Sequence, residues 1–405
     1  MWYVSDLGDS EQTPSDLATV TDYAQLTALR APRPTLLTFN ASDQCCFRAG
    51  HALPPLLDAA VPIYELYGQR DALRYHINYD PGTHNFERDN REAFYRMLGD
   101  FFYLGDKQFD WREIPSEAEV KTAEELNVPL PADNRDFHAL AVQLSRSLPV
   151  KPARGPSAQQ PLADWQRDRR QVLRKLVRVT EADVRAERVK EEAMPGGRVV
   201  LWKLEVADTW TVPAVELIPD RPRSAALVFA DSGRKATTEH VAALLHAGRR
   251  VVAIDPFYLG ESKITQRDFL YALLVAAIGE RPLGIQASQV AAIARWMAKD
   301  RDIGAVELVA VGRRSSLAAM VAAALEEKAI GHVTLWDGLL TLKEIIDRDL
   351  TVREAPELFC FGLLAQFDVP QLVALITPRT VRFSRTSPVA SAPAGSSQNP
   401  RSPRP

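Results

Sequence analysis

Short apolar runs alternate with amphipathic stretches along most of the chain. Apolar, β-branched runs predict strands at residues 34–40, 198–206, 211–218, 225–231, 250–255 and 306–311. Apolar positions at helical spacing predict helices at residues 51–60, 90–103, 237–247, 265–279, 286–300 and 315–328. Strands that alternate with helices of this length indicate an α/β fold with a doubly wound, mostly parallel sheet.

Three further segments have weaker patterns. Residues 74–85 read as a strand that runs into a loop, and residues 116–148 contain two weak helical stretches. Residues 165–191 are dense in charge with valine and leucine at helical spacing, which predicts a charged amphipathic helix. A solvated helix face is the preferred interpretation of that helix, ahead of a binding surface.

One twelve-residue segment occurs twice. Residues 22–33, DYAQLTALRAPR, match residues 368–379, DVPQLVALITPR, at seven of twelve positions, and each precedes an apparent strand. A repeated structural unit explains this match, with chance similarity in a leucine- and alanine-rich chain as the alternative. On the repeat interpretation, the chain begins in the last third of one unit and ends before the same third of the next.

These patterns divide the chain into four parts. Residues 1–110 form the C-terminal third of a first unit, and residues 111–164 are a helical connection that ends in a proline-, glycine- and polar-rich linker at 150–161. Residues 165–385 form a second unit that lacks its C-terminal part. Residues 386–405 are rich in serine, proline and arginine and are expected to be disordered.

Composition narrows the classes of partner. The 405 residues carry a net charge of -3, which gives no reason to expect nucleic acid or an anionic membrane as a partner. The chain has no signal-peptide pattern and no apolar stretch of about 20 residues, so as written it is expected to be cytoplasmic. If residues preceding Met1 are missing, export becomes the expectation. The oligomeric state is left open.

Residues 306–325 have the layout of a strand, a tight turn and an apolar helix. In a G-x-S-x-G nucleophile elbow, small residues flank a serine at the top of such a turn. Here the turn contains Gly312, Arg313, Arg314, Ser315 and Ser316, so Arg314 takes the position of the nucleophile. A guanidinium stays protonated and cannot attack a carbonyl. Ser315 is therefore a nucleophile one residue out of place or, the preferred interpretation, a residue of the first helical turn.

Two residues of the N-terminal part fit the rest of a catalytic triad. Asp43 comes just after the strand at 34–40, and His84 lies on a loop about forty residues later. Triads of the α/β-hydrolase type run in the order nucleophile, acid, histidine, so Asp43 and His84 match the last two members. A strand-end cap for Asp43 and a loop histidine at His84 are the alternatives.

Metal and cofactor sites are not indicated. His51, His76, Cys45 and Cys46 do not have the spacing of a zinc site, and the three cysteines of the chain cannot form a disulfide framework. Asp337 ends another apparent strand and could be an acid, although a capping role is preferred. We expect no cofactor and no metal.

The segments APRPTLLTFNASDQCC and DPGTHN, the turn IDPFYLGES and the elbow at residues 312–316 together resemble the α/β-hydrolase superfamily. The nearest likeness is to acetyl xylan esterase-like and prolyl-oligopeptidase-like hydrolases that carry two units in tandem. The resemblance covers about residues 20–105 and 195–385. It implies a serine nucleophile, a histidine base, an orienting aspartate and a small-molecule ester or carbohydrate-ester ligand.

Three interpretations stay open. In a composite hydrolase, Asp43 and His84 serve the elbow at Ser315, although the two copies of the repeated strand would compete for one place in the sheet. In a non-catalytic binding module, Arg313 and Arg314 bind a carboxylate. In a truncated gene product, the missing triad members lie outside the chain.

Overall fold

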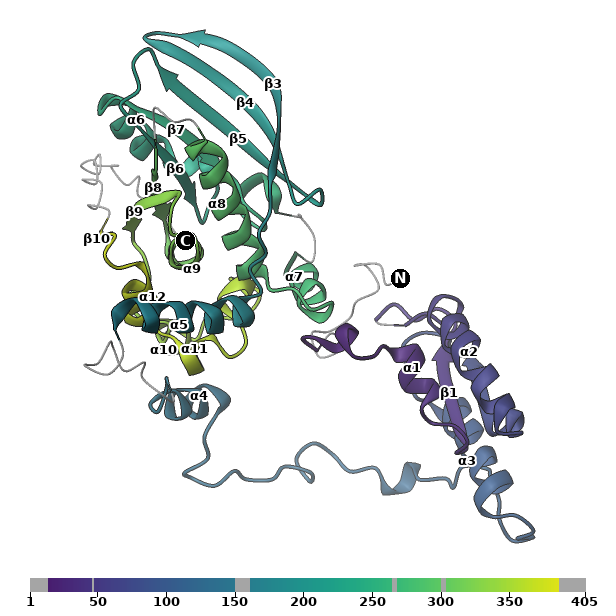
Figure 1. The fold of residues 1–405 in the computed structure, drawn as a ribbon. Coiled ribbons are helices and arrows are strands. Elements are labelled where there is room, and N and C mark those ends of the chain that lie inside the picture. Colours follow the sequence, from purple (N-terminus) through teal and green to yellow (C-terminus); the bar gives the residue numbers. More distant parts are fainter. Residues whose placement is uncertain (1–13, 46, 150–160, 264–267, 300–303, 386–405) are drawn as a thin grey trace, which may run out of the picture.

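The computed structural model describes residues 14–45, 47–149, 161–263, 268–299 and 304–385. Two sheets appear in this part of the chain, one of two strands near the N-terminus and one of eight strands (Figure 1). Most of the predicted linker at 150–161 and the whole tail at 386–405 lie outside the described residues.

The eight-stranded sheet carries most of the hydrophobic core. Its strand order is β10-β9-β8-β6-β7-β5-β4-β3. The strands are β3 (Val184–Met194), β4 (Gly197–Val206), β5 (Trp210–Pro219), β6 (Ser224–Ala230), β7 (Arg249–Ile254), β8 (Val306–Val311), β9 (Ile330–Trp336) and β10 (Val381–Ser384). The run from β10 to β7 is parallel, whereas β5, β4 and β3 add on antiparallel.

Helices flank the parallel part of this sheet, and β3 to β5 extend beyond them (Figure 1). These helices are α5 (Leu162–Val177), α6 (Thr238–His246), α7 (Asp268–Ala277), α8 (Pro282–Ala298), α9 (Arg313–Leu325), α10 (Glu344–Asp347), α11 (Leu363–Gln366) and α12 (Val369–Ile376). The five strands predicted between residues 198 and 311 are confirmed with ends within one residue. The sheet is more mixed than the sequence predicts, because the antiparallel strands β3 to β5 extend one side of it.

The predicted charged helix at 165–191 is wrong in its second half. Helix α5 ends at Val177, where Arg178 adopts a left-handed conformation with φ of 55°. Strand β3 then pairs antiparallel with β4, and charged side chains of the two strands form ion pairs such as Lys203 with Glu187. In sequence, the charged residues of an exposed edge strand resemble those of the polar face of a helix, because both surfaces face water. Of the two weak helices predicted at 116–148, only α4 (Phe137–Ser145) is longer than a three-residue turn.

Helices α8 and α9 lie closest to the sheet and are almost fully buried. Small side chains permit this close packing: α9 reads RRSSLAAMVAAAL and is buried from Ser315 onward. Gly284 of α8 faces the end of α5, where a Cβ would overlap the carbonyl oxygen of Val177. The helix-to-helix distance at that point therefore depends on the absence of a side chain.

The N-terminal unit is built around two parallel strands, β1 (Thr35–Asn40) and β2 (Leu73–Asn78). The crossover between them is α2 (Ala49–Leu66), with α1 (Tyr23–Ala28) before β1 and α3 (Arg88–Phe102) after β2. A small separate core contains Ala60, Tyr64, Ala72 and Leu73. The strand at 34–40 and the helices at 51–60 and 90–103 are thus confirmed, although α2 begins earlier and ends later than predicted.

An ionic contact joins the start of the described chain to the larger core. The Asp16 carboxylate accepts hydrogen bonds from both terminal nitrogens of Arg281, at 2.9 and 2.7 Å, and forms an ion pair with Arg178 at 2.9 Å. The hydrogen bonds from Arg281 are the main cause that lowers the pKa of Asp16. Asp16 therefore stays ionised and holds this segment against the end of α7.

Among the described residues, no single helix has the length and apolar character needed to cross a membrane. One strongly bent pair, Pro356–Gln366 with Val369–Ile376, meets that test only when the two helices are taken together.

The tight approach of α8 to α5 gives a stability prediction. Gly284→Ala should destabilise the large core by about 1–3 kcal/mol, because the added methyl group overlaps backbone that cannot move easily. Gly331→Ala is the control, since its Cβ would lie 3.4 Å from Ala305. Urea unfolding followed by tryptophan fluorescence measures both. Equal midpoints for the two variants would contradict the packing argument.

Candidate functional site

Asp43 and His84 meet at the carboxyl ends of β1 and β2. Because the two strands are parallel, the loops that follow them emerge at the same edge of the small sheet. His84 Nδ1 lies 3.0 Å from Asp43 Oδ2, and the second carboxylate oxygen accepts the Cys45 N–H at 2.8 Å. Asp43 is buried, whereas the His84 side chain is 59% exposed. The structure thus brings these two predicted residues together, as a fixed carboxylate beside an accessible imidazole.

The Asp43 carboxylate determines which ring nitrogen of His84 carries the proton. An ionised carboxylate can only accept a hydrogen bond, so the bond to Asp43 requires the proton of His84 on Nδ1. In the neutral ring this leaves the basic lone pair on Nε2. Such a histidine is held in the tautomer that can receive a proton from a nucleophile.

Four asparagines support this pair, and the sequence interpretation missed them. Asn40 ends β1 and donates to Asp43 Oδ2 at 3.4 Å and to the Asn85 carbonyl at 3.1 Å. Asn90 donates to Asn40 Oδ1 at 3.1 Å, and Asn85 donates to Asn78 Oδ1 at 3.1 Å. The sequence contained a signal for this network, because both strands end in asparagine and both loops contain turn residues. A buried polar network of this kind keeps the two loops in register.

Of the four residues considered as metal ligands, Cys46 lies outside the described residues. His76 Nε2 lies 2.7 Å from Asp89 Oδ2. No group of three or more histidine, cysteine, aspartate or glutamate side chains suited to a metal ion occurs in the described part of the chain.

In the larger unit, Gly312 forms the tight turn between β8 and α9. Gly312 adopts φ of 104°, a conformation open to glycine, and a Cβ there would collide with the Asp231 carboxylate. Arg314, the residue that the sequence prediction puts at the position of the nucleophile, lies in the first turn of α9. Its guanidinium forms an ion pair with Glu357 and lies 3.4 Å from the Tyr258 carbonyl. It is therefore committed to partners inside the protein.

The Asp231 carboxylate lies where an oxyanion would bind. In α/β hydrolases, the N–H of the residue after the nucleophile is one donor of the oxyanion hole. That residue here is Ser315, whose N–H donates to Asp231 Oδ1 at 2.7 Å, while the Arg314 N–H donates to Oδ2 at 3.2 Å. Asp231 comes directly after β6. A carboxylate of the chain itself thus accepts the N–H groups in the first turn of α9.

Ser315 is fully buried in the first turn of α9, and its hydroxyl has no hydrogen-bond partner among the described atoms. Ser316 is also buried, and its hydroxyl donates to the Arg313 carbonyl at 2.7 Å. No contact joins either serine to His84 in the described structure.

Arg313 has a different environment from Arg314. It lines a cavity of about 760 Å³ at the carboxyl edge of the sheet, together with Asp337, Glu344, Arg348 and others. Its Nε lies 3.5 Å from Glu344 Oε2. Asp337 adopts φ of 51° and donates its N–H to the Ser384 carbonyl at 2.9 Å, so it terminates β9 beside β10. Of the two predicted binding arginines, Arg313 lines this cavity, whereas Arg314 is paired with Glu357.

Comparison with known proteins places the fold. No protein-family model matches the chain, and no curated protein matches its sequence. A candidate acetyl xylan esterase from Bacteroides fragilis superposes with a TM-score of 0.52 at 17% identity, over 63% of this chain and 76% of that one. This likeness shows an α/β-hydrolase fold, which confirms the resemblance at the level of the fold.

Two other esterase structures are less similar. An acetyl xylan esterase from Paenibacillus sp. R4 has a TM-score of 0.38 at 10% identity, over 54% of this chain and 86% of that one. A CE15 glucuronoyl esterase from Teredinibacter turnerae T7901 has a TM-score of 0.38 at 13% identity, over 73% and 81%.

The Arg314–Glu357 pair gives a prediction with a definite pH dependence. Burial is the largest influence on Glu357 and raises its pKa above the ordinary value near 4.5, although Arg314 opposes the shift. Arg314→Leu removes that opposing charge, so the folded-state pKa rises further. A raised carboxyl pKa makes the folded state lose stability as pH rises above the unfolded value.

Arg314→Leu should therefore cost about 3–5 kcal/mol at pH 8, where Glu357 would be buried and charged, and clearly less at pH 4.5. The double variant Arg314→Leu/Glu357→Leu should recover much of the loss, because no unpaired charge is left. Urea unfolding at the two pH values measures this. A loss independent of pH would show that packing, and not charge, dominates at this position.

Proposed function

We propose that the chain is a protein of the carboxylic-ester hydrolase type, in which Asp43 and His84 form the acid–base pair and the elbow at Arg314 is non-catalytic. The observation that carries the proposal is the 3.0 Å contact between His84 Nδ1 and Asp43 Oδ2 at the carboxyl ends of two parallel strands. The proposed ligand is a small ester, such as an acetylated carbohydrate.

The pair has the parts required for proton transfer. Asp43 orients the ring and stabilises the imidazolium that forms when Nε2 takes a proton. Its burial behind the asparagine network keeps the carboxylate fixed, while the exposure of His84 leaves the ring open to a substrate. General base catalysis by such a histidine requires a hydroxyl group or a water molecule within about 3 Å of Nε2.

The elbow of the larger unit supports only the non-catalytic part of the proposal. Arg314 cannot act as a nucleophile, Ser315 is buried, and Asp231 occupies the backbone donors that would stabilise an oxyanion. A negative carboxylate in that place also repels a developing oxyanion. Hydrolysis by the chain as it stands would therefore depend on His84 acting on water or on the ester itself, and we expect it to be slow.

The division into two hydrolase units is part of the same proposal. Residues 22–33 and 368–379 match in sequence, and each forms a helix with an aspartate–glutamine capping box that leads into a parallel strand. Residues 1–110 would then be the last third of one unit and residues 165–385 a second unit. The small sheet has the two strands, acid and histidine that such a third contains.

Hydrolysis of p-nitrophenyl acetate by the purified chain tests the acid–base pair. We expect a slow rate that falls at least about tenfold in His84→Ala, since general base catalysis contributes about 10²–10⁴-fold. Asp43→Asn should also lower the rate, because the amide no longer fixes the tautomer. Ser315→Ala and the surface control His246→Ala should not change it.

Two results would count against the proposal. An equal rate in His84→Ala would assign the activity elsewhere, and a rate lost in Ser315→Ala would make the elbow the catalytic centre. Circular dichroism of each variant separates loss of the pair from loss of the fold.

A further inference from the structure

Residues 22–33 and 368–379, which match in sequence, differ in how far their leucines are buried. Leu372 and Leu375 of α12 are fully buried against the large core. Their counterparts near α1 are Leu26, which is 40% exposed, and Leu29, which is 75% exposed. The same leucines at the same helical positions thus have a partner surface in one copy and face solvent in the other.

The arginine that ends each segment shows which surface is missing. Arg379 donates hydrogen bonds to the carbonyls of Ala323, Glu326 and Ile330, at 2.7, 2.8 and 2.9 Å. These carbonyls lie at the end of α9 and the start of β9. Its counterpart Arg33 is exposed. Arg33 therefore lacks the backbone carbonyl acceptors that the end of a helix and the start of a strand offer to Arg379.

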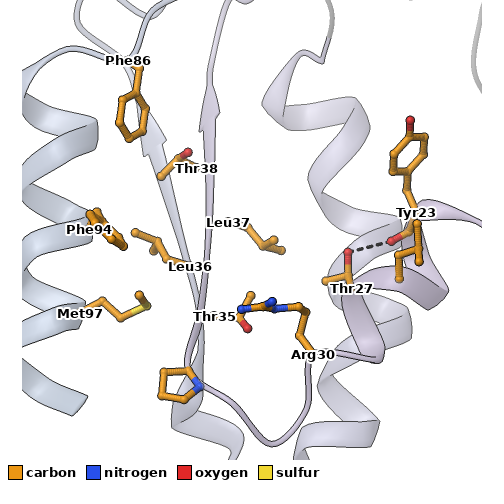
Figure 2. Close-up of a pocket in the computed structure, with 12 residues that line it drawn as sticks. Tyr23, Thr27, Arg30, Thr35, Leu36, Leu37, Thr38, Phe86, Phe94 and Met97 are labelled. Carbon is orange, nitrogen blue, oxygen red and sulfur yellow. Dashed lines mark hydrogen bonds between the residues drawn. The ribbon is translucent and has the colours of Figure 1, made fainter. Parts of the chain in front are cut away.

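An apolar cleft and a strand edge lie beside these residues. Strand β1 pairs with β2 on one side, and on its other side the described structure has a single bridge, from Asn40 to Arg48. A cavity of about 480 Å³ follows that edge, lined by Leu26, Thr27 and Arg30 near α1, by residues 34–38, and by Phe94 and Met97 of α3. Figure 2 shows side chains of α1 and α3 on the two sides of β1.

We propose that this face is an interface with a second copy of the chain, in which α1 and β1 of one copy take the place of α12 and β10 of the other. In the described structure, the copy of this segment in α12 and β10 packs against α9, β9 and α5, and Arg379 bonds the α9–β9 surface. In this exchange, α12 and β10 of the accepting copy leave the α9–β9 surface, and the matching leucines and arginine of α1 and β1 replace the contacts that are lost.

The segment match fixes the register of the exchange. Thr35–Thr38 correspond to Val381–Ser384, which pair with Val333–Trp336 of β9. Strand β1 is two residues longer than β10, and β9 begins three residues before its paired stretch. In this arrangement β2 would continue the sheet, and Asp43 and His84 would come to its carboxyl edge on the same side as the partner's α9 N-terminus.

The association is testable without a substrate, so its failure would leave the proposed role of Asp43 and His84 standing. Sedimentation velocity of the full chain over a range of concentrations should show a monomer–dimer equilibrium. Leu26→Glu/Leu29→Glu should abolish the dimer, and Arg33→Ala should weaken it at least several-fold. Leu66→Glu, at an exposed leucine outside the cleft, should leave it unchanged.

Cross-linking tests the register. A chain with Thr35→Cys, mixed with a differently tagged chain with Val333→Cys, should give a disulfide-linked heterodimer under mild oxidation. The pairing of Thr35→Cys with Trp336→Cys should not, since three residues along a strand are about 10 Å.

A monomer at all concentrations overturns the proposal. So does a dimer that Leu26→Glu/Leu29→Glu and Arg33→Ala leave intact, or cross-linking that is equal in the two registers. A mixture of singly substituted chains cannot form the bond within one chain, so the heterodimer band reports exchange between copies alone.

Discussion

The carboxylate of Asp231 fixes the carboxyl edge of the large sheet. It follows β6, accepts the first free N–H groups of α9, and lies against Gly312, so it holds the central strands and their most buried helix in one geometry. The N-terminus of a helix carries a partial positive charge that attracts anions. Here the Asp231 carboxylate of the chain itself accepts the N–H groups of Arg314 and Ser315 and so supports the start of α9.

Arg314, in the same turn, is paired with a second buried carboxylate. A guanidinium at the top of the elbow would be costly if left without partners in a buried place, and Glu357 supplies the opposite charge from a neighbouring segment. The elbow is therefore a closed electrostatic unit of two carboxylates, one arginine and two backbone donors. The acid–base pair of the N-terminal unit has the opposite character, with a buried anion that leaves its partner histidine accessible.

Much of this could be read from the sequence, and the failures have physical causes. The strands of the large sheet were predictable because buried parallel strands are short continuous apolar runs. The contact between Asp43 and His84 was predictable from the chain order of a hydrolase triad, which puts the acid after a strand and the histidine on a later loop. The edge strand β3 was not, since its charges pair with β4 across the sheet and continue the charged pattern of the helix α5 that precedes it. The role of Asp231 could not be predicted either, because nothing local distinguishes an aspartate that caps a distant helix.

The small sheet has a consequence for how the chain unfolds. Two strands with a core of a few side chains are marginal on their own, whereas the central strands β6, β7 and β8 of the large sheet are buried on both faces. The small sheet has its own core, and a long irregular segment before α4 connects it to the larger unit. The two units therefore unfold in separate cooperative transitions. The protein thus has at least two unfolding free energies, and a single melting temperature would describe neither. The scaffold of Asp43 and His84 would be lost while most of the molecule was still folded.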